Sequence, residues 1–313
     1  MAGYLKGMNA SGPVTLFDRA LLRAHRHRAL KAGQPATFLL DRVTEELADR
    51  LGLILRDFDM AVDLGTPTDA LARHLRQLPK VRDVIRLSDG PEPFCSTDGL
   101  TAVADEEALP LKPQSVSLIA SALALQTVND LPGTLIQIAR ALKPDGLFVA
   151  ALLGGRTLYE LRDALMAAEA EIDGGLSPRV APFTDVREAG SLLQRAGLAL
   201  PVTDLDTLTV RYDNAFALFR DLRAMGATNM LIERTRKPAT RGLFMRTAEI
   251  YQERYGAGDG RIPATFEILY LSGWAPHESQ QKPLRPGSAK ARLAEALGTN
   301  EFAAGEKAGP GKP

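Results

Sequence analysis

The sequence predicts an α/β protein built on a doubly wound, mostly parallel sheet. Short apolar segments with the spacing of strands alternate with helical segments over about ninety residues, from 60 to 153. This alternation is typical of a parallel sheet that carries helices on both faces. The first strand ends in Asp63-Leu64-Gly65 and opens directly into a helix. Because ligands of such sheets bind at the carboxyl ends of the strands, we expect a site at this turn.

The first half of the chain supplies five of the strands. Leu40, Val43 and Leu47 recur at helical spacing, and Pro132 stands in the first turn of a helix that ends before a turn at 143–146. We expect helices over 38–55, 68–78 and 132–142, and strands over 60–65, 81–87, 100–104, 115–125 and 147–153. Together these segments form the parallel part of the sheet.

The second half departs from the short repeat. We expect helices over 156–172, 185–196, 215–225 and 241–255, and strands over 205–212 and 265–273. The sheet then has seven strands, with helical insertions at 156–200 and 213–262. We therefore divide the chain into a basic N-terminal segment (1–37), a main domain (38–275) and a C-terminal segment (276–313). The Gly-, Ala-, Lys- and Pro-rich tail is expected to lack order from Ala303.

Composition excludes several classes of protein. The 313 residues carry 38 basic and 38 acidic side chains, so the net charge is zero and a nucleic-acid partner is not expected. Cys95 is the single cysteine, and the four histidines show neither zinc spacing nor a facial triad, so we expect no metal. A reducing compartment fits best: the bacterial cytoplasm, or the mitochondrial matrix in a eukaryote.

The N-terminal segment is basic between Arg19 and Lys31. It has no apolar core of a signal peptide, and the chain has no run long enough to cross a membrane. A solvated helix face is the favoured interpretation of the basic stretch. The alternative is contact with an acidic partner or with a membrane surface as a peripheral protein.

The turn after the first strand is where class I methyltransferases hold S-adenosylmethionine. Their pattern is an acid followed by three glycines at alternate positions, which let the backbone approach the ligand. Here Asp63 and Gly65 are present, but Pro67 and Asp69 replace the second and third glycines. The stretch from Thr66 also has the residues of a helix start, with Thr66 as N-cap and Asp69 in the capping-box position. S-adenosylmethionine is therefore a weakly supported cofactor.

Two further places complete the expected cofactor site. Asp89 follows the second strand, where an acid meets ribose hydroxyls in related folds; a turn acid is the alternative. Gly154-Gly155-Arg156-Thr157 opens the long helix after the fifth strand and could hold an anion, or Thr157 could cap that helix. No catalytic residue follows from these patterns.

The chain resembles a specific family, the complex I assembly factors of the methyltransferase superfamily (arginine-hydroxylase type) and their bacterial relatives. The matching segments lie at 16–19, 104–110, 128–132, 142–146, 154–162, 177–178, 182–184, 273–274 and 277–280. The resemblance implies a role in building respiratory complex I, with an arginine of an iron–sulfur subunit as the target. It also implies that Asp105 and Glu106 contact the adenine end of the cofactor. Gln126-Thr127 stands where the family shows His-Trp.

Three functions remain open at this point. The first is an assembly factor with a degraded cofactor loop that acts by binding a complex I subunit. The second is a working S-adenosylmethionine-dependent methyltransferase on a protein or small carboxylate, of the malonyl-carrier-protein type. The third is a protein arginine hydroxylase.

Overall fold

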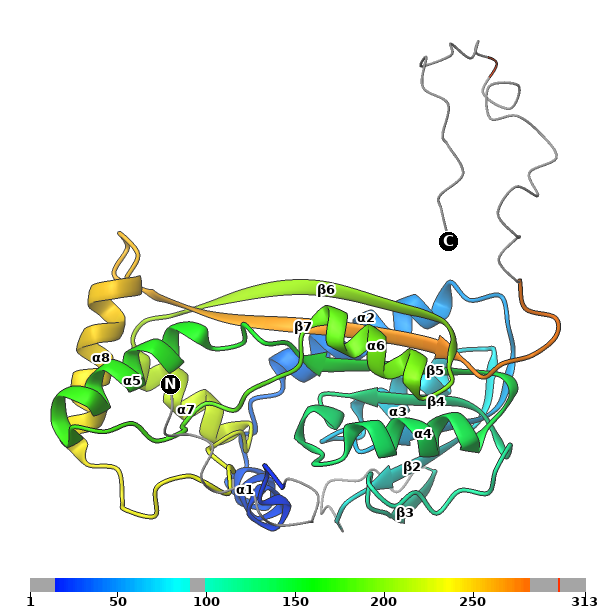
Figure 1. Cartoon of the computed structure of the whole chain (residues 1–313), viewed down its shortest axis with the longest axis horizontal. Coiled ribbons are helices and arrows are strands. Elements are labelled where there is room, and N and C mark those ends of the chain that lie inside the picture. The colour runs from blue at the N-terminus through cyan, green and yellow to red at the C-terminus, as the bar shows by residue number, and fades with distance from the viewer. Residues whose placement is uncertain (1–14, 91–98, 282–297, 299–313) are drawn as a thin grey trace, which may run out of the picture. The chain divides into compact units, whose positions relative to one another are not determined.

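The structure, a computed structural model, describes residues 15–90, 99–281 and 298. Its centre is a seven-stranded sheet in the order β3-β2-β1-β4-β5-β7-β6 (Figure 1). The strands are β1 (Phe58–Leu64), β2 (Val81–Ser88), β3 (Leu100–Val103), β4 (Val116–Ala122), β5 (Leu142–Leu153), β6 (Ala199–Tyr212) and β7 (Ile262–Trp274). The first five strands pair in parallel, and β7 runs antiparallel to both β5 and β6. The predicted doubly wound, mostly parallel sheet is confirmed.

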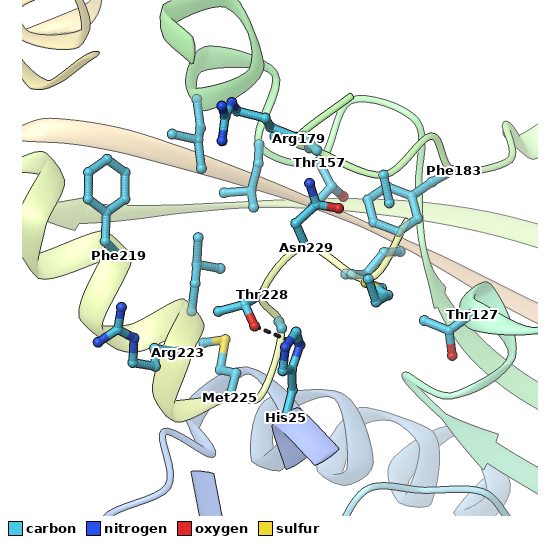
Figure 2. A pocket seen from close by; sticks show the side chains of 18 of the residues that line it. His25, Thr127, Thr157, Arg179, Phe183, Phe219, Arg223, Met225, Thr228 and Asn229 are labelled. Carbon is cyan, nitrogen blue, oxygen red and sulfur yellow. Dashed lines mark hydrogen bonds between the residues drawn. The ribbon is translucent and has the colours of Figure 1, made fainter. Parts of the chain in front are cut away.

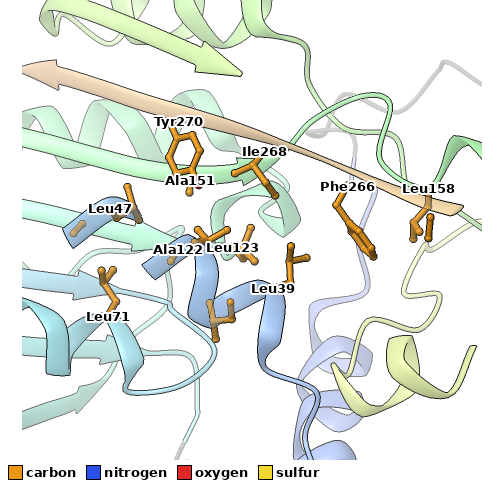
Figure 3. Packing of buried hydrophobic residues seen from close by; sticks show 14 of the residues in the cluster. Leu39, Leu47, Leu71, Ala122, Leu123, Ala151, Leu158, Phe266, Ile268 and Tyr270 are labelled. Atoms are coloured by element: carbon orange, nitrogen blue, oxygen red, sulfur yellow. The ribbon is translucent and has the colours of Figure 1, made fainter. Parts of the chain in front are cut away.

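Helices cover both faces of this sheet. They are α1 (Arg19–Lys31), α2 (Phe38–Gly52), α3 (Ala70–Gln77), α4 (Leu131–Ala141), α5 (Tyr159–Asp173), α6 (Val186–Arg195), α7 (Ala215–Ala224) and α8 (Arg241–Tyr255), with a short 3-10 turn, η1 (Leu125–Thr127). Helices α2 and α3 share one apolar core with the sheet, and α4 and α6 share the other. Figure 3 shows part of the first core, with Leu47 of α2, Leu71 of α3 and Ile268 of β7. The same core includes buried residues of α5, α7 and α8.

Several boundaries differ from the predicted ones for local reasons. Strand β6 begins at Ala199 instead of 205, because it pairs with β7 along nearly its whole length. The predicted turn at 143–146 lies inside β5, where the register with β4 shifts and Asp145 takes a φ of 61°. Helix α5 begins at Tyr159 instead of 156, because Leu158 adopts the left-handed conformation (φ 52°) and interrupts the helix there.

The segment from Leu16 to α1 lies against the carboxyl edge of the sheet. Phe17 forms an isolated bridge with Leu231, and the Asn129 side chain accepts hydrogen bonds from the backbone N–H groups of Leu16 and Phe17 at 2.8 and 2.7 Å. Asp18 accepts from the backbone of Leu21 and so begins α1. These contacts position α1 beside the loops that follow the parallel strands, where ligands of this fold class bind.

The chain divides into a compact unit, Met1–His277, and a second unit, Glu278–Pro313. The tail expected to lack order from 303 lies outside the described residues, as does Cys95. Within the described part of the chain, no helix is long and apolar enough to span a bilayer.

Candidate functional site: the carboxyl edge of the sheet

Four of the five predicted cofactor residues come together at the carboxyl edge. Gly65 follows β1, Asp89 follows β2, and Asp105 and Glu106 follow β3. Asp89 is close enough to Glu106 to raise the pKa of that carboxyl through charge repulsion. The structure therefore groups these residues, although their role toward a cofactor stays a prediction.

Asp63, the fifth predicted residue, stands two positions before Gly65 and is buried there. Its side chain is fully buried beside the equally buried Arg86 of β2, whose Nε lies 3.8 Å from a carboxylate oxygen. Burial raises the pKa of Asp63 to about 7, against the opposing effects of the Thr66 hydroxyl and the Arg86 charge. Arg86 also donates to the carbonyl of Thr66 at 2.9 Å. Asp63 therefore belongs to an internal pair that supports the turn.

The turn after β1 differs from the predicted helix start. Thr66 is buried and its hydroxyl accepts from the backbone of Ala122 at 3.2 Å, so it ties the turn to β4 and does not cap the helix. Helix α3 begins three residues after Pro67, at Ala70, and the Asp69 side chain pairs with Arg73 at 3.2 Å. The predicted N-cap at Thr66 is wrong because the neighbouring strand offered a stronger tertiary partner.

The space over Gly65 is filled by Glu106. Gly65 takes a φ of 71°, and a Cβ placed on it would lie 2.5 Å from Glu106 Oε1 and 2.9 Å from Glu106 Cγ. Burial raises the pKa of Glu106, while the nearby Arg19 charge lowers it. A buried carboxylate thus occupies the position that the glycine turn leaves open.

Arg19 holds this carboxylate in place. Its guanidinium pairs with Asp105 and Glu106, and reaches Glu107 at 3.7 Å. The side chain of Arg19 is 11% exposed and that of Glu106 is 4% exposed. We call Arg19, Asp105, Glu106 and Glu107 the Arg19 cluster. Sequence reasoning missed Arg19 as a partner of the acidic motif, although Arg19 lies in a segment that matches the family.

A cavity of about 470 Å³ adjoins this edge (Figure 2). Its walls come from α1, α2, α5, α7, α8, the loops after β4 and β5, and the start of β7. Most of the lining is apolar, with Leu39, Leu161, Phe219 and Phe266 on different walls. The volume lies within the range of small-molecule pockets. A smaller hollow of about 130 Å³ shares Gln126 with it and extends to Pro67 of the turn.

The polar groups of the cavity are few, and those with charge are cationic. The His25 ring nitrogen Nδ1 lies 2.7 Å from the Thr228 hydroxyl, and burial lowers the pKa of His25. Arg179 is neutralised by Glu169, which accepts from its Nη2 at 2.8 Å. Arg223 stands at the rim on α7. Among the described residues that line the cavity there is no Asp or Glu.

The glycine turn after β5 is structural. Gly154 packs against Glu267, whose carboxylate accepts from the backbone of Arg156 at 3.0 Å. The Thr157 hydroxyl donates to the Glu267 carbonyl and accepts from its N–H, at 3.2 and 3.1 Å. Thr157 therefore joins the turn to β7, and the alternative prediction that it caps α5 is wrong. Two of the N–H groups that were expected to hold an anion, those of Gly154 and Arg156, already donate to Glu267.

Metal ligands do not gather in the described part of the chain. No group of three His, Cys, Asp or Glu side chains there has the geometry to hold an ion. His277 follows Trp274 at the end of β7.

The strand order and the single antiparallel strand define the class of protein, a methyltransferase-type α/β fold. Residues 60–150 match the methyltransferase domain family. A solved Bacillus subtilis protein, YcgJ, superposes with a TM-score of 0.51 at 16% identity, covering 75% of this chain and 98% of its own. At that identity the likeness shows the fold alone.

The close relatives place the chain within this class. The mitochondrial arginine-hydroxylase NDUFAF5 of Danio rerio is 38% identical over 296 residues, which are 93% of this chain and 90% of the relative. The human protein of the same name is 38% identical over 93% of this chain and 86% of its own. The chain therefore belongs to the NDUFAF5 arginine-hydroxylase family, the methyltransferase-superfamily assembly factors. A malonyl-[acyl-carrier protein] O-methyltransferase of Xylella fastidiosa is 40% identical, over 55% of this chain and 56% of the relative.

The fold class uses S-adenosylmethionine, but the turn after β1 does not fit it as it stands. Glu106 fills the space over Gly65, and Arg19 holds it there. Pro67 has no N–H to offer, and the carbonyl of Thr66 is engaged by Arg86. The cofactor would have to displace the Arg19 cluster in order to reach the glycine backbone.

Proposed function

We propose that this chain acts by binding a protein, an iron–sulfur subunit of respiratory complex I, and not by transferring a methyl group. The observation that carries the proposal is the Glu106 carboxylate against Gly65, held by Arg19. Family membership supports the assembly role. A bacterial cytoplasm, or the matrix of a mitochondrion, is the proposed location.

Arginine hydroxylation, the activity for which the relatives are named, receives less support from the cavity. A guanidinium substrate is best bound by carboxylates, which form paired hydrogen bonds with it. The described lining of the cavity offers none, and its rim carries Arg223. A substrate arginine would therefore bind at another surface or bring its own counter-ion.

Methyl transfer is the second candidate, and one observation favours it. The hollow beside Pro67 shares Gln126 with the cavity, so the two adjoin each other at the turn where the fold class brings cofactor and substrate together. Methyl transfer would require Glu106 and Arg19 to move away from Gly65 so that the cofactor could bind there.

Two measurements separate these functions. Thermal unfolding with millimolar S-adenosylmethionine should leave the melting temperature unchanged, because only a ligand of the native state raises it. A shift in the wild-type chain that is lost in Asp105→Ala would overturn the proposal in favour of methyl transfer. Affinity capture of the tagged full chain from its host should enrich complex I subunits. Capture that enriches none of them, while the tag and fold are intact, removes the assembly role.

A further inference from the structure

Two hollows of the molecule lie side by side at α1 and α7, with three lining residues in common. The first is the cavity described above. The second is a groove of about 710 Å³ between α1 and α7, lined by His25, Arg28, Ala29, Ala32, Arg220, Arg223, Ala224 and Thr228. The cavity and the groove share His25, Arg223 and Thr228. We call this groove the α1/α7 groove.

The α1/α7 groove is strongly cationic. Arg28, Arg220 and Arg223 are all exposed, and no acidic side chain is among its described lining residues. None of the three guanidiniums has an ion pair with a carboxylate of the described chain, in contrast to Arg19, Arg179 or Arg234 elsewhere in the unit. Arg28 also lowers the pKa of His25 through its charge, after the larger effect of burial. The field at the groove therefore attracts an anion.

The cavity beyond the groove is apolar. Leu39, Leu161, Leu165, Phe219, Phe244 and Phe266 face it from five different elements. Figure 2 shows Phe219 and Met225 on the α7 side, with the Arg223 guanidinium beside them and His25 on the α1 side. An apolar chain that filled this space would gain from burial in proportion to its area.

A single bound molecule accounts for the cationic groove and the apolar cavity better than contact with a bilayer surface does. The apolar residues of α1 are turned into the protein, where Leu22, Ala29 and Leu30 are buried. Helix α1 therefore presents no apolar face to insert between lipids, as an interfacial helix must. The apolar space lies inside the protein, where only a chain that has left the membrane can reach it.

We propose that the cavity and the α1/α7 groove form one binding site for an amphipathic anion. An alkyl chain occupies the cavity, and a terminal carboxylate or phosphate meets Arg28, Arg220 and Arg223 in the groove. The site takes one dispersed molecule. It shares no lining residue with the Arg19 cluster, and the inference does not depend on the complex I partner.

Calorimetric titration with saturated fatty acids of increasing length, each below its micelle concentration, tests the site. We expect one molecule per chain, with an affinity that rises roughly fourfold for each added methylene until the cavity is full. The matching alkyl phosphate should bind too, and the alcohol of equal length should bind at least about tenfold more weakly because it lacks the charge. Equal binding of the alcohol and the acid overturns the proposal without any variant.

Variants test where the anionic group and the alkyl chain of the ligand bind. The Arg28→Glu/Arg223→Glu double variant should weaken dodecanoate binding by roughly tenfold or more. Arg187→Glu replaces an exposed arginine of α6 that lines neither the cavity nor the groove, and should leave dodecanoate binding unchanged. Leu222→Trp, which fills the cavity from α7, should weaken long chains more than short ones. Circular dichroism confirms that each variant is folded.

An experiment with vesicles distinguishes a dispersed amphiphile from a membrane surface as the ligand. Sedimentation with phosphatidylglycerol vesicles should recover little protein, and dodecanoate should not change that amount. Binding to vesicles with no binding of dispersed amphiphile would overturn the proposal in favour of a membrane surface. Affinities that Arg28→Glu/Arg223→Glu and Leu222→Trp both leave unchanged would overturn it as well.

Discussion

Replacing Arg19 by alanine removes a cation that contacts Asp105, Glu106 and Glu107 together. The three ion pairs differ in their exposure, and this exposure decides how much unfolding free energy each one contributes. The side chain of Asp105 is 48% exposed, so its pair with Arg19 contributes at most about 1 kcal/mol. The pair with Glu106 is buried, and loss of one partner from a buried pair costs about 3–5 kcal/mol. At pH 8 we expect Arg19→Ala to lose about 3 kcal/mol of unfolding free energy, the lower end of that range.

The loss should depend on pH in a defined direction. Burial already raises the pKa of Glu106, and without Arg19 it rises further. A carboxyl with a raised pKa in the folded state stabilises the fold at low pH, and this contribution disappears as the pH rises through the folded-state pKa. The variant should therefore be close to the wild type near pH 5 and fall behind it towards pH 8.

Urea unfolding at pH 5, 6.5 and 8 measures the effect. Arg23→Ala is the matched control, because Arg23 lies one turn further along α1, is exposed, and acts on Asp105 through its charge without an ion pair to a described carboxylate. Adding Glu106→Gln to Arg19→Ala should remove the pH-dependent part of the loss. A cost below about 1 kcal/mol at pH 8, or a cost that does not change with pH, would refute the account of the buried pair.

Three other substitutions test the turns around the site. Asp63→Asn should abolish a titration near pH 7, because burial raises the pKa of Asp63 from its ordinary value of 3.8 to about 7 in the folded state. As the pH rises from 4 to 8, the wild type should therefore lose up to about 4 kcal/mol of unfolding free energy relative to the variant. Gly65→Ala should lower the unfolding free energy by about 2–3 kcal/mol, because Gly65 has a φ of 71° and the new Cβ would collide with Glu106. A fall in melting temperature of less than about one degree would contradict this prediction. Thr157→Val should cost about 1–3 kcal/mol by leaving the Glu267 N–H unpaired, whereas Thr157→Ser should keep most of the stability in the same denaturation assay.

Much of the fold was predictable because it depends on local pattern. Apolar runs separated by helical segments predict parallel strands with helices on both faces, and all seven strands were found near their expected positions. The errors lie at ends of elements. Thr66 has the residue type and position of an N-cap, yet its hydroxyl binds Ala122 of a neighbouring strand. A pattern in the sequence contains no information on such a competing tertiary partner.

The site was predictable in part. Placing Gly65, Asp89, Asp105 and Glu106 at one edge needed only the rule that parallel strands end together. The loss of two glycines from the turn also pointed to a weakened cofactor site. The same rule placed Asp63 at the edge, but its side chain is fully buried beside Arg86, its register partner on β2.

The sequence by itself determined the class of fold, the family and the acidic motif, because each depends on residue types at short spacing. Only the tertiary structure decided what the acidic motif contacts. Arg19 is 86 residues from Asp105, and the Phe17–Leu231 bridge that places it spans a still longer stretch of chain. The cationic groove likewise needs α1 and α7 side by side. Contacts between distant segments depend on how the whole chain packs, and charge interactions within a few ångströms depend on the burial that this packing creates.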